Sequence, residues 1–242
     1  MEADKVINGN CWVTCFDILG FTEKVSEFEK GSGRGHLDVF VDVFYQELLD
    51  ELQRHGKYWP DKIFTTWFSD TFLFFTRDDS GVSFTHNSTT VTNFCQSVMS
   101  KGWPLQAAIG FGQLYADKSN NIFVGSGLID AYSYTEKQNW IGLVVTPKAN
   151  NRLRELGVEL RRRPVRFKEY DVPVKRKKIE KGVCTIIEET ERLFAVRIHK
   201  LSNVIRYIEH MKKEAVHKNP KDYNDRYGVK YENTLKFFKQ CL

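Results

Sequence analysis

An apolar segment that ends in a carboxylate and a glycine constrains the fold of this chain most. Residues 11–16 are almost all apolar, a composition typical of a buried strand. Asp17 follows at once, and Gly20 comes shortly before a stretch that predicts a short helix over 22–30. The chain therefore passes from a buried strand through a turn at 17–21 into a helix, and a carboxylate lies where the strand ends.

A second carboxylate, Asp70, lies between two further apolar segments, 62–68 and 71–76, which predict a hairpin with an acidic tip. Carboxylates on adjoining strand ends can share divalent cations, because Mg²⁺ and Mn²⁺ prefer oxygen ligands. Backbone N–H groups at a helix start next to such a site attract phosphate. Asp17 and Asp70 therefore predict a site for a metal-bound nucleoside triphosphate.

Strands and helices alternate along the rest of the first two thirds of the chain. Apolar residues recur at helical spacing over 36–54 and 84–101. Further strands are predicted at 104–115 and 141–146, and further helices at 125–136 and 147–156. This order of elements favours an α+β fold with a mixed or antiparallel sheet flanked by helices.

The pattern changes after about residue 160. Residues 161–181 hold ten basic and three acidic side chains, a local charge of +7 in a chain whose formal net charge is +5. β-prone pieces at 165–168, 171–175 and 182–188 precede two helices, near 201–211 and 231–238. We predict a main domain at 10–160, followed at 161–242 by a basic β segment and a helical C-terminal appendage. A solvated face is the simplest interpretation of the basic segment, with phosphate steering or a partner contact as alternatives.

The five cysteines occur singly in apolar stretches, without the spacing of zinc ligands or of a disulfide framework. This pattern predicts reduced, buried thiols in a cytoplasmic protein. We also expect no secretory leader and no membrane-spanning segment, and therefore no membrane partner.

The segment Phe16-Asp17-Ile18-Leu19-Gly20-Phe21-Thr22 resembles the Asp-Ile-x-Gly-Phe-Thr opening of the class III adenylate and guanylate cyclase domain. The Ser69-Asp70 unit resembles that family's hairpin, in which Gly-Asp carries the second metal ligand. The stretches 108–112 and 125–132 resemble its glycine strand and following helix. Within the superfamily, the chain is most similar to the bacterial pyrimidine cyclases of Pycsar anti-phage defence. They share its Asp-x-Leu-Gly-Phe opening and a tryptophan-glycine pair like that in Trp140-Ile141-Gly142.

This resemblance implies a homodimer with two active sites at the interface. Asp17 and Asp70 would bind two divalent ions per site, Mn²⁺ or Mg²⁺, with the backbone carbonyl of Ile18 as a further ligand. The N–H groups from Leu19 through Gly20 and Phe21 to Thr22 would hold the triphosphate. The products would be a 3′,5′-cyclic monophosphate and pyrophosphate, and a separate effector protein would respond to the cyclic nucleotide.

Departures from the family pattern bear on the substrate. Purine cyclases place a base-reading Lys or Glu where this chain has Thr66, which favours a smaller base. We predict UTP as the substrate, with CTP as the near alternative, and Phe16 as a second candidate for the base pocket or else a core residue. The family's Asn and Arg correspond to Ile129 and Ser133, so another cation is needed near the α-phosphate. Candidates for that cation are Lys137, Lys148 and Arg152.

Two functions of other classes stay open. The absence of Asn and Arg at Ile129 and Ser133 also fits a catalytically inactive nucleotide sensor of the same fold. The basic segment 161–181 fits a nucleic-acid-binding module whose binding would be steeply salt-dependent. We nevertheless expect no nucleic-acid partner, because acids at the strand ends would repel phosphate unless a metal bridged the two.

Overall fold

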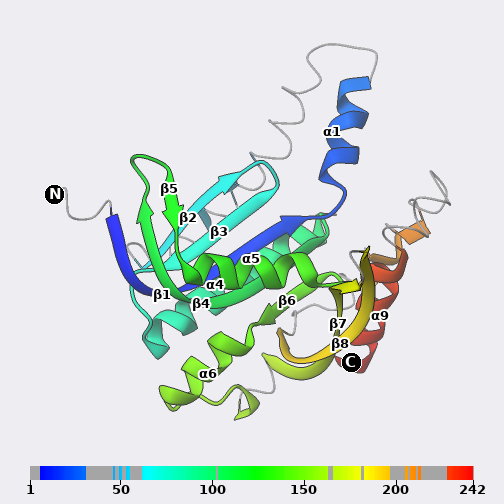
Figure 1. The fold of residues 1–242 in the computed structure, drawn as a ribbon. Coiled ribbons are helices and arrows are strands. Elements are labelled where there is room, and N and C mark those ends of the chain that lie inside the picture. The colour runs from blue at the N-terminus through cyan, green and yellow to red at the C-terminus, as the bar shows by residue number, and fades with distance from the viewer. Residues whose placement is uncertain are drawn as a thin grey trace.

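A computed structural model describes the chain at residues 6–30, 62–101, 103–162, 166–180, 183–196 and 228–241, with short helical pieces at 46, 49–50, 53–54, 205–206, 208–210 and 212–213 (Figure 1). The helices predicted at 36–54 and 201–211 therefore lie largely outside the described residues.

Within the described residues, eight strands form one mixed sheet in the order β2-β3-β1-β4-β6-β8-β7, with β5 paired to β4. The strands are β1 Val6–Ile18, β2 Ile63–Phe68, β3 Thr71–Thr76, β4 Leu105–Asp117, β5 Ile122–Val124, β6 Gly142–Val145, β7 Phe167–Glu180 and β8 Val183–Val196. β4 and β6 run parallel, and the other paired strands run antiparallel. The sheet confirms the predicted mixed α+β architecture and the predicted hairpin around Asp70.

Helices flank the sheet on both faces (Figure 1). The longer described helices are α1 Phe21–Lys30, which projects beyond the end of β1, α4 Gly81–Ser100, α5 Ser126–Lys137, α6 Pro147–Glu155 and α9 Gly228–Cys241, with a 3₁₀ turn at Leu160–Arg162. Successive side chains of β1 point to opposite faces. Trp12 and Phe16 pack with α4, whereas Val13 and Cys15 pack in the smaller cluster that contains Ala131 of α5. This alternation places Asp17 on the α5 face.

Helix α5 lies unusually close to β4 because β4 carries glycine at the crossing. A Cβ atom on Gly110 would lie 2.7 Å from the backbone nitrogen of Ala131. The run of small residues predicted as a strand at 104–115 therefore brings a helix directly onto the sheet next to β1.

The basic region beyond residue 160 folds into a long hairpin that belongs to the same sheet. β8 pairs with β6, and the apolar side of α9 packs into the large core cluster, where Phe237 lies 4.8 Å from Trp140 between ring centroids. The separate strand pieces predicted here are parts of β7 and β8. Whether 10–160 and 161–242 are distinct units stays a prediction.

Part of the basic charge is neutralised within this hairpin. Arg161 forms an ion pair with Glu169 at 2.7 Å, and Arg176 forms one with Glu189 at 3.2 Å. These exposed pairs agree with a solvated face more than with a nucleic-acid platform.

Three cysteine side chains that the structure describes are buried. Cys11, Cys15 and Cys95 are free and buried, and burial raises the pKa of each thiol to about 12, so they are neutral at pH 7. Of the described helices, none has the length and apolar character that crossing a membrane requires.

Candidate functional site

The structure brings the two predicted carboxylates to adjoining strand ends. Asp17 is the strand partner of Thr71 at the start of β3, and Asp70 immediately precedes Thr71. The two-residue turn Ser69-Asp70 joins β2 to β3, and Ser69 has the left-handed backbone angle φ 56° that such a tight turn requires. The hairpin therefore presents Asp70 next to the end of β1.

Electrostatics show that these carboxylates act on one another. Asp17 is partly buried, and its pKa is raised to about 7, first by burial and then by the negative charges of Asp70 and Glu136. The positive charge of Lys230 opposes this shift. A cation beside Asp17 would favour its charged form and so offset this penalty.

The donor set fits Mg²⁺ or Mn²⁺. Both ions prefer hard oxygen ligands, and in nucleotide sites they are held by one or two carboxylates together with phosphate oxygens and water. Among the residues that the structure describes, no group of three or more His, Cys, Asp or Glu side chains is close enough to hold a metal. Asp17 and Asp70 stay the predicted carboxylate ligands, and the Ile18 carbonyl stays a predicted further ligand.

The turn after β1 allows only part of the predicted phosphate contact. Gly20 adopts φ +75°, the left-handed conformation that lets the chain turn from β1 into α1. The N–H of Leu19 donates to the carbonyl of Pro104 at 2.9 Å, so it is already used within the fold. The predicted phosphate contacts are thus narrowed to the N–H groups of Gly20, Phe21 and Thr22.

The two residues proposed for the base pocket lie on opposite faces of the sheet. Phe16 is 0% exposed, and its ring centroid lies 5.2 Å from Phe74 and 5.3 Å from Phe94 on the α4 face. Its assignment to the base pocket is therefore wrong, because strand alternation turns it away from Asp17. Thr66 pairs with Leu73, which pairs with Cys15, so Thr66 shares the face of Asp17.

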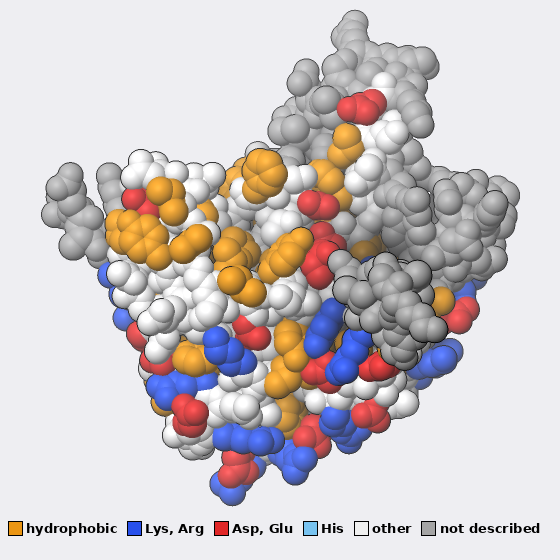
Figure 2. All heavy atoms as spheres, viewed as in Figure 1, with side chains coloured by type: hydrophobic (Ala, Val, Ile, Leu, Met, Phe, Trp, Pro, Cys, Tyr) orange, Lys and Arg blue, Asp and Glu red, His pale blue; other side chains and the backbone are white. Residues whose placement is uncertain are grey.

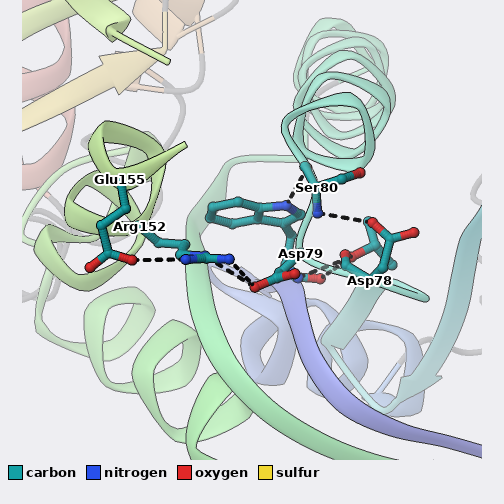
Figure 3. Close-up of polar contacts among 7 residues, drawn as sticks. Asp78, Asp79, Ser80, Arg152 and Glu155 are labelled. Carbon is teal, nitrogen blue, oxygen red and sulfur yellow. Dashed lines mark hydrogen bonds and ion pairs between the residues drawn. The ribbon is translucent and has the colours of Figure 1, made fainter. Parts of the chain in front are cut away.

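The three cations suggested by the sequence have partners elsewhere. Lys137 lies 2.7 Å from Glu191 and Lys148 3.3 Å from the hydroxyl of Ser126. Arg152 is held by Asp79 at 2.8 Å and by Glu155 at 2.8 Å, next to the loop that begins α4 (Figure 3). The carbonyl of Ser80 in that loop accepts a hydrogen bond from the indole N–H of Trp12, which lies in β1 five residues before Asp17. None of the three is therefore placed as the cation of the Asp17 site.

Sequence reasoning missed a fourth cation, Lys230 in α9. Its side chain is buried, and its ammonium donates to the side-chain oxygen of Gln106 at 2.7 Å. The pKa of Lys230 is lowered to about 8, first by burial and then by the positive charge of Lys175, whereas Asp17 and Glu136 act to raise it. The sequence offered no signal for this residue, because its partners lie in distant strands and α9 reads as an ordinary amphipathic helix.

Large apolar side chains are exposed around the carboxylates. Phe68, at the hairpin tip, is 82% exposed and Ile129, on α5, is 66% exposed. Figure 2 shows hydrophobic side chains gathered over β5, the β2–β3 hairpin and α5, with acidic side chains next to them. Phe68 shares the face of Asp17 by strand register, and the exposed apolar residues of α5 are Ile129 and Tyr132.

No protein-family model and no curated protein sequence matches this chain. Solved structures to which the chain is similar include the adenylyl cyclase CyaB from P. aeruginosa, which is 12% identical and has a TM-score of 0.41, with 81% of this chain and 97% of that chain covered. A bacterial light-regulated adenylyl cyclase is 10% identical with a TM-score of 0.44, covering 85% and 98%. An adenylate/guanylate cyclase/hydrolase from Silicibacter pomeroyi is 13% identical with a TM-score of 0.43, covering 79% and 96%. At this level of similarity the substrate is not indicated.

Proposed function

We propose that this protein is a class III-type nucleotidyl cyclase that converts a pyrimidine nucleoside triphosphate to its 3′,5′-cyclic monophosphate and pyrophosphate. The observation that carries the proposal is the placement of Asp17 and Asp70 on adjoining strand ends, next to the turn that begins α1. Carboxylates that repel one another next to a helix start suit a metal-bound triphosphate. The cyclic product would act as a second messenger in bacterial anti-phage defence, read by a separate effector.

Each part of the site has a role in this reaction. Asp17 and Asp70 would hold two ions of Mg²⁺ or Mn²⁺, which when bound lower the pKa of the ribose 3′-hydroxyl and neutralise the leaving pyrophosphate. The N–H groups at the start of α1 would hold the β- and γ-phosphates. The 3′-oxygen attacks the α-phosphorus of the same molecule as the bond to pyrophosphate breaks. Positioning and electrostatics therefore supply most of the catalysis.

Thr66 supports a pyrimidine substrate. It lies on the same face of the sheet as Asp17 and offers a short hydroxyl where a purine-reading residue would have a long charged side chain. A hydroxyl both donates and accepts, so it does not by itself separate the uracil O4 from the cytosine amino group. UTP is the first proposal, and CTP is the alternative.

An active homodimer would cover the exposed apolar face. Phe68 and Ile129 flank the carboxylates, and burying such side chains contributes about 25 cal/mol per Å² of apolar surface. A second copy seated there would enclose the site from the side that this chain leaves open.

An inactive nucleotide sensor of the same fold is the second candidate. It is favoured by the apolar, exposed Ile129, at a position where an active enzyme of this type would carry a polar side chain toward the phosphates. Such a sensor would bind nucleotide with metal and release no pyrophosphate.

The two candidates separate in one assay. The purified protein is incubated with Mn²⁺ and, separately, with ATP, GTP, CTP or UTP, and the products are resolved by chromatography, with Asp70→Asn as the blank. We expect a cyclic product from UTP or CTP alone. Turnover of ATP or GTP would overturn the role of Thr66, and nucleotide binding without any product would favour the sensor.

A further inference from the structure

Helix α9 buries a lysine side chain near the strand ends that carry the candidate site. Lys230 is only 8% exposed, although lysine is among the residues least often buried. Among the described residues, its ammonium makes one hydrogen bond, 2.7 Å to the side-chain oxygen of Gln106. An ammonium has three N–H donors, so two remain for an anion.

Gln106 is held in one orientation, which fixes the position of the ammonium. Its amide nitrogen donates to the carbonyls of Gln138 and Trp140, both at 2.7 Å. Because both of these partners only accept, the amide oxygen must face Lys230. The buried glutamine therefore serves as a rigid support for the lysine.

The same glutamine is the direct strand partner of Asp17. The register of β1 and β4 pairs Asp17 with Gln106, so their side chains leave the sheet on the same face at neighbouring positions. The lysine that Gln106 holds is thus brought to the Asp17 edge of the sheet. Its charge acts on both Asp17 and Glu136.

Two further contacts fasten α9 in place. The hydroxyl of Thr234 accepts from the N–H of Ile141 at 2.7 Å, and the amide of Asn233 donates to the carbonyl of Asn139 at 2.9 Å. Lys230, Asn233 and Thr234 share one side of the helix at spacings of three and four residues. α9 therefore uses its polar side to bind the segment between α5 and β6, next to the site.

A second positive charge acts on Lys230. Lys175 of β7 acts electrostatically on Lys230 from the basic hairpin. An anion that carries several negative charges would offset the repulsion between these two cations. The carboxylates alone would be balanced by a metal, whereas a triphosphate needs protein cations as well.

We infer, on the basis of the proposed function, that Lys230 is the protein's cation for the triphosphate. Gln106 orients this lysine of α9, which takes the place of an arginine on α5. Its field attracts the phosphate chain to the Asp17 edge and opposes the approach of a metal ion on its own. Loss of the charge should therefore weaken triphosphate binding without weakening metal binding, whereas loss of a merely structural residue should weaken both.

The test compares binding of Mn²⁺ alone with binding of inorganic triphosphate in the presence of Mn²⁺, both by isothermal titration calorimetry. Lys230→Gln removes the charge but keeps a donor for Gln106, Lys230→Arg keeps the charge, and Lys236→Gln is the control on the exposed side of α9. We expect Lys230→Gln to weaken triphosphate binding about tenfold or more, as for the loss of a charged hydrogen bond. Its affinity for Mn²⁺ alone should be unchanged or higher.

Lys230→Arg and Lys236→Gln separate the charge of Lys230 from other effects of substitution in α9. Lys230→Arg should bind triphosphate within about threefold of the wild type, and Lys236→Gln should match the wild type. Equal weakening of both ligands by Lys230→Gln, or no change in either, would overturn the role of Lys230 and leave the proposed function standing. If Lys230→Gln does not fold, a large loss of triphosphate binding in a folded Lys230→Arg protein would overturn it instead. Wild-type protein that binds neither Mn²⁺ nor triphosphate would overturn the proposed function itself.

Discussion

Asp17 links the stability of the protein to pH through its raised pKa. Its pKa in the fold is about 7, against an ordinary value of 3.8, because burial and the neighbouring acids disfavour the charged form. The folded state therefore binds a proton more tightly than the unfolded chain does. The resulting stability is fully present below pH ~4 and is lost as pH rises through about 7, by at most about 4 kcal/mol.

This dependence can be measured by urea unfolding at pH 5 and pH 8 with EDTA present. The free energy of unfolding of the wild type, relative to Asp17→Asn, should fall between the two pH values. Addition of Mn²⁺ at pH 8 should restore the wild type and not the variant. A wild type that tracks Asp17→Asn at both pH values would refute the coupling, and the exposed Asp171→Asn is the control.

At the scale of elements, the contact between α5 and β4 depends on Gly110. A Cβ there would lie 2.7 Å from the backbone nitrogen of Ala131 and 2.9 Å from a carboxylate oxygen of Asp130. Because backbone cannot move aside as a flexible side chain can, Gly110→Ala should cost about 1–3 kcal/mol of unfolding free energy.

Gly9 supplies the matched control in β1. A Cβ at Gly9 meets nothing within 4 Å, so Gly9→Ala should stay within about 0.5 kcal/mol of the wild type. Denaturant midpoints of the two variants show whether the close approach of α5 to β4 makes Gly110→Ala the more destabilising. Similar midpoints would show that α5 does not depend on this close approach.

Local sequence patterns were sufficient for the elements with strong periodicity. The hairpin at 62–76 and the helix now seen as α4 follow from runs of apolar residues with clear ends. β5 was missed because Ile122–Val124 is too short to show a pattern. β7 and β8 were broken into pieces because charged residues alternate along an exposed hairpin, and their continuity comes from pairing with each other.

At the scale of the whole molecule, the exposed apolar face predicts self-association. Ile129→Glu would place a charge in the centre of that face and should convert a dimer to a monomer, as measured by size-exclusion chromatography with light scattering. Ile186→Glu, at a side chain on β8 that is similarly exposed, should leave the dimer intact. A monomeric wild type, or a dimer unaffected by Ile129→Glu, would contradict a dimer built on this face.

The candidate site shows where sequence reasoning reaches its limit. Asp17 and Asp70 could be proposed because each follows or interrupts an apolar strand, a signal that is local. Lys230 could not, because its importance arises from a hydrogen bond to Gln106, which lies 124 residues earlier in the chain. Phe16 was open to either assignment until the register of β1 fixed which face it occupies.

The metal site at Asp17 and Asp70 is tested most directly by Mn²⁺ binding, measured by electron paramagnetic resonance of the free ion. Wild-type protein is titrated beside Asp17→Asn, Asp70→Asn and the control Asp171→Asn. We expect the wild type and the control to bind Mn²⁺ alike, and each site variant to bind it at least about tenfold more weakly, as for the loss of a charged ligand. Unchanged Mn²⁺ binding in both site variants would contradict a metal site at Asp17 and Asp70, and the proposed cyclase would fall with it.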